Sequence, residues 1–526
     1  MQIFIKQCHV LFDRMPVNDC RGDDFMSFKI AFIGAGSIGF TRQLLKDILT
    51  VKEFSGIEVA FTDINEKNLD MVTRLCQRDI DANGLNIKIK ATLDRRDALK
   101  NAKYVFNVVR IGGLDAFKLD IDIPLKYGID QCVGDTLCAG GIMYGQRGIA
   151  AVLGFCRDIR EVAAPGCIML NYANPNAMIT WACNKYGKVK TIGLCHGVQG
   201  GHAQIANVLG LKKEEVDIIC AGINHQTWYI QVKYKGQDMT GKLLEAFENH
   251  PEYSKTEKVR IDILKRFGYY STESNGHLSE YVPWYRKRPE EINEWIDLGC
   301  WINGETGGYL RVCTEGRNWF ETDFPNWMKE PPKKYVNEDR SGEHGSYIIE
   351  GLETGRVYRG HFNVVNNGII SNLPDDAVVE VPGYVDGNGI NIPMVGELPM
   401  GCAAVCNNSI SVQRMAVEAA VHGDDRLLRQ AMMLDPLVGA VCNPPEIWQL
   451  VDEMLVAEEM WLPQYKNAIE EAKKRLASST QLKTREGYTG AARLKTKTVE
   501  EMARDAEAAR KNAGAADKAE ERPAAE

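Results

Sequence analysis

The chain has 526 residues, of which 44% are hydrophobic and 25% charged, a balance typical of a globular protein with two or three domains. Its formal net charge of −8 argues against a nucleic-acid-binding protein, because an acidic surface repels a phosphate backbone. No apolar stretch approaches the roughly 20 residues that a membrane-spanning helix needs. We therefore expect neither a nucleic acid nor a membrane as a partner.

The first 27 residues differ in residue pattern from those that follow. The stretch Met1–Asp24 is irregular and contains Cys8, Pro16 and Cys20, whereas Met26 leads directly into an apolar strand. We expect translation to begin natively at Met26, so that residues 1–27 form an extension that is non-native or dispensable.

Fifteen cysteines without a recognisable secretory signal indicate free thiols in a reducing cytoplasm. An extracellular, disulfide-bonded protein is the alternative on the cysteine count alone.

From residue 28 to about residue 200, short apolar runs alternate with amphipathic stretches, a pattern typical of βαβ units around a parallel sheet. The apolar runs predict strands at Lys29–Ile33, Glu58–Thr62, Tyr104–Val108, Ile168–Asn171 and Thr191–Leu194. Helical spacing of apolar residues predicts helices at Ile38–Leu49, Glu66–Ala82, Gly145–Val162 and Asn176–Lys185. The fold class is thus α/β, a Rossmann-like, doubly wound parallel sheet.

The texture changes after Gly200. Residues 201–465 are mixed in periodicity and richer in Trp and Tyr, which indicates an α+β domain for substrate binding and oligomerisation, with a loop at Pro331–Lys334. Residues 466–526 are rich in Ala, Glu and Lys and are expected to be helical at first and frayed or disordered at the end.

A glycine-rich turn follows the first predicted strand and opens the first predicted helix. Its sequence is Gly34-Ala35-Gly36-Ser37-Ile38-Gly39. The first glycine permits a tight turn, the second lets the backbone approach a pyrophosphate, and the third lets helix and strand pack closely. Asp63 ends the second strand about two dozen residues on, where a carboxylate binds the ribose hydroxyls and favours NAD over NADP. The alternative is an α/β turn that binds nothing.

Four polar clusters stand out, and three of them follow predicted strands. They are Asn171–Pro175, Cys195–Val198, Gly222–His225 and Gly276–Tyr281. Each has an ordinary structural explanation, such as a turn or a buried thiol. Together, Cys and His side chains beside a dinucleotide site suggest a metal near the nicotinamide, although Cys195 and His225 are too far apart for a zinc ribbon.

In this order, the clusters resemble glycoside hydrolase family 4, in particular its melibiase-type α-galactosidases. The similarity runs from about Phe28 to Pro463. Its further motifs are Gly134–Leu137, Gly193–His196, Ala221–His225, Ser279–Trp284, Ile370–Pro374 and Val379–Pro382.

The resemblance implies roles for individual residues. Members of the family use NAD and a divalent metal, usually Mn²⁺, whose ligands match Cys195 and His225. Tyr281 matches the catalytic base, and either His196 or Asp135 is the general acid. Asn174 and His196 match residues that contact the sugar.

The resemblance also implies an unusual hydrolysis. NAD oxidises the sugar at C3, which acidifies C2–H; deprotonation, elimination of the aglycone, addition of water and re-reduction follow. α-Galactosides are the expected substrates, with α-glucosides or α-hexuronides as competitors. Two departures bear on this choice, Gly197 in place of the usual Ser after Cys-His and Cys138-Ala139 in place of Gly-Pro. We expect Gly197 to open space for a different C6 substituent, including a carboxylate.

Two other classes of function remain open. An ordinary 2-hydroxy-acid dehydrogenase, of a fold related to lactate and malate dehydrogenases, would use Arg110 for a substrate carboxylate but gives no role to Cys195, His225 and Tyr281. A catalytically inactive NAD-binding module is the other. The resemblance to family 4 also implies that the protein assembles as a homodimer or homotetramer.

Overall fold

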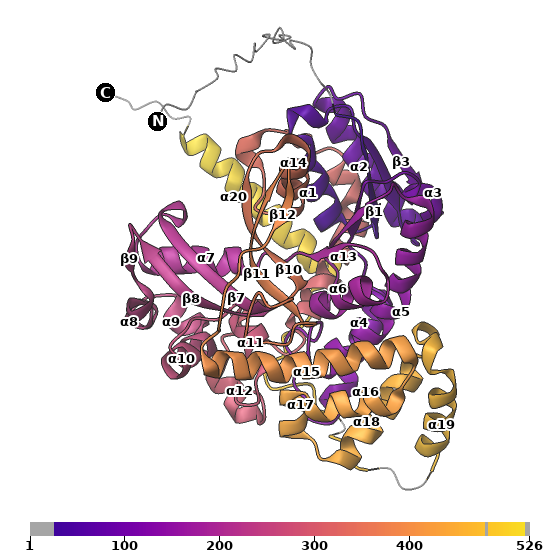
Figure 1. Ribbon diagram of the computed structural model, residues 1–526, viewed down its shortest axis with the longest axis vertical. Coiled ribbons are helices and arrows are strands. Elements are labelled where there is room, and N and C mark those ends of the chain that lie inside the picture. The colour runs from indigo at the N-terminus through magenta and orange to yellow at the C-terminus, as the bar shows by residue number, and fades with distance from the viewer. Residues whose placement is uncertain (1–25, 479–481, 486, 521–526) are drawn as a thin grey trace, which may run out of the picture.

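The computed structural model describes residues 26–478, 482–485 and 487–520. The hypothesis that translation starts at Met26, and with it Cys8 and Cys20, concerns residues that lie outside the described part of the chain. Within the described part a single 12-stranded sheet runs through the molecule, and helices lie on its two faces (Figure 1).

The first half of the sheet is the predicted parallel one. Its strands pair in the order β3-β2-β1-β4-β5-β6, the strand order of a dinucleotide-binding fold. The strands are β1 (Lys29–Ile33), β2 (Glu58–Thr62), β3 (Ile89–Thr92), β4 (Tyr104–Asn107), β5 (Ile168–Asn171) and β6 (Thr191–Gly193). The prediction of a doubly wound α/β sheet is confirmed.

Helices connect these strands. They are α1 (Ile38–Leu49), α2 (Glu66–Ala82), α3 (Arg95–Leu99), α4 (Gly113–Lys126), α5 (Cys138–Val162) and α6 (Asn176–Lys185). The predicted start of α5 at Gly145 is wrong, because the helix begins seven residues earlier, at Cys138. Gly140 and Gly141 lower helix propensity, and tertiary packing of this first turn overrides that local preference. Strand β3 and helices α3 and α4 were not predicted.

The sheet continues into the second half of the chain with antiparallel strands. Strand β10 pairs with β6 through Asn363 and Gly193, and β11 pairs with β7 through Glu380 and Gly222. These strands are β7 (Val216–Ile223), β8 (Gln226–Tyr234), β9 (Gln237–Asp238), β10 (Tyr358–Val365), β11 (Val378–Asp386) and β12 (Gly389–Asn391).

The helices of the second half complete the α+β arrangement that its mixed periodicity indicated. They are α7 (Gly197–Val208), α8 (Leu243–Glu248), α9 (Tyr253–Thr256), α10 (Lys258–Phe267), α11 (Asn275–Tyr281), α12 (Pro289–Trp295), α13 (Gly308–Trp327), α14 (His344–Thr354), α15 (Met400–His422), α16 (Asp425–Leu434), α17 (Pro436–Val441) and α18 (Pro444–Ala457). Residues 331–334 lie in a loop, as predicted.

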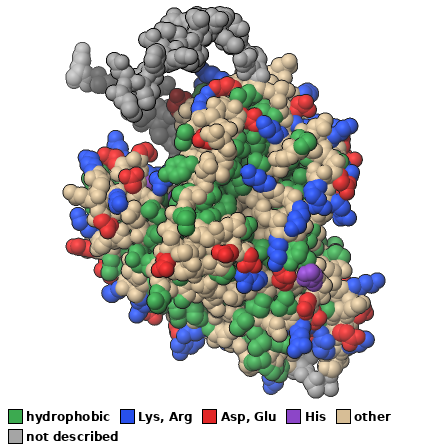
Figure 2. Space-filling model, viewed as in Figure 1, with side chains coloured by type: hydrophobic (Ala, Val, Ile, Leu, Met, Phe, Trp, Pro, Cys, Tyr) green, Lys and Arg blue, Asp and Glu red, His purple; other side chains and the backbone are tan. Residues whose placement is uncertain are grey.

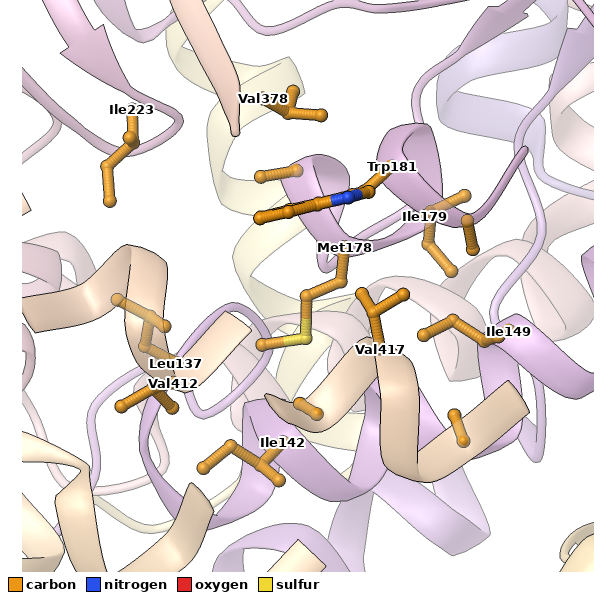
Figure 3. Packing of buried hydrophobic residues seen from close by; sticks show 14 of the residues in the cluster. Leu137, Ile142, Ile149, Met178, Ile179, Trp181, Ile223, Val378, Val412 and Val417 are labelled. Carbon is orange, nitrogen blue, oxygen red and sulfur yellow. The ribbon is translucent and has the colours of Figure 1, made fainter. Parts of the chain in front are cut away.

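One hydrophobic core joins the two halves. Met178 and Trp181 of α6 face Val412 and Val417 of α15, and Ile142 of α5 lies below them (Figure 3). Since α5 and α6 belong to the first half and α15 to the second, the halves share buried surface and not only a linker.

The C-terminal segment folds back over the body. Helix α19 (Lys466–Leu476) packs beside α18, and α20 (Val499–Glu520), which was not predicted, lies against α13 (Figure 1). Between them the backbone N–H of Ala491 donates to Asp130 (2.9 Å) and that of Ala492 to Thr306 (3.2 Å). Residues 488–492 therefore take part in the packing of the folded chain.

Charged side chains lie mostly near the outline of the face seen in Figure 2, and its middle is largely hydrophobic or uncharged. Among the described residues, no helix combines the length and the apolar character that crossing a membrane requires.

Candidate active site

The glycine-rich turn between β1 and α1 lies beside Asp63 at the end of β2. Gly34 has a φ of +87°, which favours glycine, and a Cβ there would lie 2.9 Å from Val109. The backbone N–H of Gly36 donates to Asp63 Oδ2 (2.8 Å), and a Cβ on Gly36 would lie 2.9 Å from the same oxygen. The turn therefore holds the carboxylate next to the backbone that a dinucleotide would approach.

The start of α1 offers backbone donors at the same place. Ser37 is the N-cap and its side chain makes no capping hydrogen bond, so the first amides of α1, from Ile38 onward, face out of the helix end. The expected packing role of Gly39 is wrong, because an added Cβ would meet no atom within 4 Å. The place where a side chain of residue 39 would lie is therefore empty, which leaves room beside the N-terminus of α1.

Three side chains from distant segments meet where β6, β7 and the segment before α11 converge. Ligand atoms of Cys195, His225 and Glu273 all lie within 4.8 Å of one another. Glu273 Oε2 is 3.3 Å from Cys195 Sγ and 3.6 Å from His225 Nε2. A cysteine sulfur, an imidazole nitrogen and a carboxylate oxygen form a donor set that fits a divalent transition-metal ion. The structure thus brings together the two expected ligands, Cys195 and His225.

A hydrogen-bonded chain orients His225. Its Nδ1 lies 2.9 Å from Thr136 Oγ1, and that hydroxyl donates to Asp135 Oδ1 (2.9 Å). Because the hydroxyl proton goes to the carboxylate, Nδ1–H donates to Thr136 and Nε2 keeps its lone pair for a cation. His225 also has a φ of +64°, a left-handed backbone conformation that costs free energy for any residue other than glycine.

Burial and neighbouring charges set the protonation of this cluster. Burial alone would raise the pKa of Glu273, but His225 and His277 lower it to about 2. Burial, and to a smaller extent the charge of the Glu273 carboxylate, raises the pKa of Cys195 well above its usual value. The Gly197 N–H donates to Cys195 Sγ (3.4 Å) and so favours the thiolate, although it does not outweigh burial.

Helix α11 presents His277 and Tyr281 to the same cluster. The His277 ring is 4.8 Å from that of His225 and 6.0 Å from that of Tyr281. Burial, with the neighbouring His225, lowers the pKa of His277 to about 4, so this imidazole is neutral. Tyr281 is fully buried; burial and the carboxylates Glu280 and Asp135 raise its pKa well above the ordinary value.

Asp135 is buried and occupied by polar partners. Besides the Thr136 bond, its Oδ2 accepts from Asn174 Nδ2 (3.0 Å) and lies 3.5 Å from the Arg110 guanidinium. Arg110 itself stacks on the rings of three aromatic residues, Phe117, Tyr144 and Tyr309. The aromatic rings and Asp135 thus account for the position and charge of Arg110 without a hydroxy-acid substrate.

His196 differs from the other members of the cluster because it faces solvent. Its side chain is 61% exposed, and its Nδ1 lies 3.4 Å from Glu343 Oε1. The Glu343 carboxylate raises the pKa of His196 to about 9, so the imidazole carries a proton at neutral pH. His196 can therefore donate a proton, whereas Asp135 accepts hydrogen bonds through both oxygens.

The expectation that Gly197 opens space for a sugar substituent is wrong. A Cβ on Gly197 would lie 1.8 Å from Glu273 Oε2, so the space beside this glycine is filled by a carboxylate.

Sequence reasoning missed Glu273, Thr136 and His277 as members of the site. His277 and Thr136 lie within motifs that were singled out, but Glu273 lies outside them, and nothing local marks it. Ser274, the N-cap of α11, was the available signal, because it marks where the chain turns into the helix that carries His277 and Tyr281.

Most of the chain is similar to known glycosyl hydrolases. The model of the family 4 glycosyl hydrolases matches residues 29–211, and that of the family 4 glycosyl hydrolase C-terminal domain matches residues 220–438. An α-galactosidase of Rhizobium meliloti (strain 1021) is 59% identical over 92% of this chain and 99% of its own. An α-galactosidase of Bacillus subtilis (strain 168) is 36% identical over 83% of this chain and 100% of its own.

Among solved structures, a 6-phospho-α-glucosidase from gut microorganisms, in complex with NAD and glucose-6-phosphate, superposes with a TM-score of 0.69. It is 27% identical and covers 83% of this chain and 99% of its own.

Proposed function

Because the chain belongs to family 4 of the glycosyl hydrolases, we propose that it hydrolyses α-galactosides with the help of NAD and a divalent metal ion, Mn²⁺. The observation that carries the sugar specificity is the 59% identity to an α-galactosidase along nearly the whole of both chains. NAD is supported by the related structure that contains it, and the metal by the donor set of Cys195, His225 and Glu273.

The contents of the site favour a neutral sugar over a hexuronide. The Glu273 carboxylate fills the space beside Gly197, where a C6 carboxylate was expected to fit. No room is therefore left beside Gly197 for a C6 carboxylate, so this position gives no support to a hexuronide.

Bound NAD would supply hydride transfer to and from the sugar, and a divalent cation held by Cys195, His225 and Glu273 would supply the positive charge that makes a sugar C–H beside the oxidised carbon acidic. Tyr281 is the base for the C2 proton. Its buried phenol is protonated in the protein alone, so it needs the positive charge beside it to be ionised.

His196 is the general acid for the departing glycosidic oxygen. The ion pair with Glu343 keeps its imidazole protonated, and its exposure leaves the proton accessible to a group that enters from solvent, which supports this role. Asp135 then has a positioning role, because it holds the amide of Asn174, which contacts the sugar, and orients His225 through Thr136.

NAD would be held at the carboxyl ends of β1 and β2. The backbone of Gly34 and Gly36 leaves room for a pyrophosphate there, and the first amides of α1, near Ser37, Ile38 and Gly39, would face its negative charge. Asp63 would bind the ribose hydroxyls, and its carboxylate beside Gly36 supports a preference for NAD over NADP, because a 2′-phosphate would meet a negative charge.

The test uses the purified protein with NAD, Mn²⁺ and a reductant, and offers p-nitrophenyl α-galactoside, α-glucoside and α-glucuronide in separate assays. We expect nitrophenol from the galactoside, and loss of activity when either NAD or metal is withheld. Release without NAD would contradict the redox mechanism, and a preference for the glucoside or glucuronide would contradict the sugar specificity. Accumulation of NADH with a simple hydroxy acid would favour the dehydrogenase.

We also propose that the protein acts in the cytoplasm as a homodimer or homotetramer. All the cysteines that the structure describes are free thiols, as expected in a reducing compartment. Met394, between β12 and α15, and Met400, the first residue of α15, are 76% and 88% exposed and suit a protein–protein contact. Light scattering should give a multiple of the 58.8 kDa chain mass, and a monomer mass would refute the assembly.

A further inference from the structure

Gly197 and Glu273 are in direct steric contact, although 75 residues separate them. An ideal Cβ on Gly197 would lie 1.8 Å from Glu273 Oε2 and 2.5 Å from Glu273 Cδ. Atoms cannot approach so closely, so any side chain at position 197 would force the carboxylate out of its place.

The backbone that carries Glu273 has little freedom to retreat. The preceding Thr272 donates its N–H to Thr227 O (2.9 Å) on β8, and the two threonine hydroxyls lie 2.5 Å apart. The following Ser274 caps α11 by accepting from the His277 N–H (3.2 Å). Because Thr272 and Ser274 are both held by hydrogen bonds, the Glu273 carboxylate can move only by a change of side-chain rotamer. The carboxylate can occupy its observed place because Gly197 has no side chain.

That position points Oε2 at the atoms expected to hold the cation. Cys195 Sγ donates its proton to Oε2 over 3.3 Å, and His225 Nε2 is 3.6 Å from the same oxygen. A cation that replaces the thiol proton would be bound by the sulfur, the nitrogen and the oxygen together, and the proton would pass to solvent.

We propose that Glu273 is the third protein ligand of the divalent cation, and that Gly197 keeps the ligand position open. This inference rests on the proposed metal dependence of the enzyme. A carboxylate oxygen suits Mn²⁺ better than the soft thiolate does, and two anionic ligands balance the charge of a divalent cation.

The alternative is that Glu273 is only a countercharge for the surrounding histidines. Two histidines near Glu273 already have other partners. His277 is hydrogen-bonded through Nδ1 to Ser274 (2.6 Å), and His196 forms an ion pair with Glu343. Neither histidine therefore needs Glu273 for a partner, which leaves its oxygen to the atoms of Cys195 and His225.

The test measures Mn²⁺ affinity of the full-length protein directly, by titration with detection of free Mn²⁺ by electron paramagnetic resonance, with NAD and a reductant present. We expect Glu273→Gln and Gly197→Ser each to weaken binding at least about tenfold, as loss of groups around metal sites typically does. Gly200→Ser is the matched control on α7, because a Cβ on Gly200 would meet nothing within 4 Å.

Combining the substitutions separates a shared mechanism from two independent ones. If Gly197 acts only through the carboxylate, Gly197→Ser should weaken binding no further in a Glu273→Ala background. NAD affinity and the thermal midpoint, measured on each variant, identify any that misfolds, and Gly197→Ser provides an independent test if Glu273→Gln is unstable.

Wild-type affinity in Glu273→Gln would overturn the inference while leaving the proposed function intact. A wild-type protein that binds no Mn²⁺ would instead overturn the proposed metal dependence, and the inference with it. Equal losses in Gly200→Ser and Gly197→Ser would show that α7, and not the contact with Glu273, accounts for the effect.

Discussion

At the residue scale, a short chain of hydrogen bonds links the candidate metal ligand to the candidate sugar-binding amide. His225 bonds Thr136, Thr136 bonds Asp135, and Asp135 bonds Asn174. The three hydrogen bonds are 2.9 to 3.0 Å long, and Asp135 and His225 are buried. A change in the orientation of one of these side chains therefore changes the orientation of the next. Asp135 therefore affects activity through geometry even if it never transfers a proton.

Tyr281→Phe should separate catalysis from stability. The Tyr281 hydroxyl is buried and makes no hydrogen bond of normal length and angle to the described residues, so its removal leaves no partner unsatisfied. We expect kcat to fall about 10²- to 10⁴-fold, the usual contribution of a general base, with the thermal midpoint unchanged or raised. Steady-state kinetics and a thermal melt measure the two effects.

Tyr285→Phe is the matched control for that substitution. The Tyr285 hydroxyl donates to Asp262 (2.8 Å), so its removal should lower the thermal midpoint and leave kcat unchanged. If both variants kept full activity, Tyr281 would not be the base.

At the scale of elements, the first turn of α5 packs directly against the segment that carries Asp135 and Thr136. A Cβ on Gly141 would lie 2.5 to 3.0 Å from the backbone of Thr136. Backbone atoms cannot rotate away as a side chain can, so this close approach depends on glycine.

We expect Gly141→Ala to lower kcat/KM about 100-fold, because displacing Thr136 moves both Asp135 and His225. The cost in the free energy of unfolding should be about 1 to 3 kcal/mol, as for other overpacked sites. Gly154→Ala on the same helix is the control, since the nearest atom to its Cβ would be 3.9 Å away on the flexible side chain of Arg157. Comparable activity losses in the two variants would contradict this account.

The contact between α3 and α5 should depend on pH. Asp158 on α5 accepts hydrogen bonds from Arg95 and Arg96, and these outweigh the effect of burial, so the pKa of Asp158 is lowered. A lowered pKa in the folded state means that the stabilisation is present above the unfolded pKa of about 3.9 and is lost as the pH falls through the folded value.

Asp158→Asn should therefore reduce the free energy of unfolding at pH 7 by about 1 kcal/mol, a modest value because the arginines are partly exposed. The difference from wild type should shrink towards pH 3. Urea denaturation at several pH values measures it, and a constant difference across that range would refute the linkage.

At the scale of the whole molecule, one continuous sheet and one core join the NAD-binding half to the half that supplies His225, Glu273 and Tyr281. A catalytic site assembled from both halves requires that they do not move independently. The sheet pairing of Gly193 with Asn363 lies only two residues from Cys195, so the junction is itself next to the metal cluster.

We expect calorimetry to show a single unfolding transition that NAD shifts as a whole. NAD at a hundred times its Kd should stabilise the folded chain by about 2.7 kcal/mol, because it binds only the folded state. Two transitions, of which NAD moves only the first, would show that the halves unfold separately.

The dinucleotide half could be predicted from the sequence because its signals are local. Apolar runs defined β1, β2 and β5 to the residue, and helical spacing defined α1, α2 and α6. Strand β3 escaped because its burial is uneven along only four residues, and the start of α5 escaped because glycines that weaken a helix are there to let backbones approach.

The sequence by itself determined the family, the doubly wound sheet and the glycine turn with Asp63, because each of these depends on a motif or a pattern of neighbouring residues. Cys195 and His225 became candidate ligands through the family resemblance, since their spacing alone left a metal site open. Only the tertiary structure decided that Glu273 lies beside the expected ligands and that Gly197 makes room for it. It also decided that Thr136 bonds the ring of His225, and that the His277 ring lies near the rings of His225 and Tyr281. Those contacts join segments that are far apart in the chain, and folding brings them together where the sheet passes from one half of the molecule to the other.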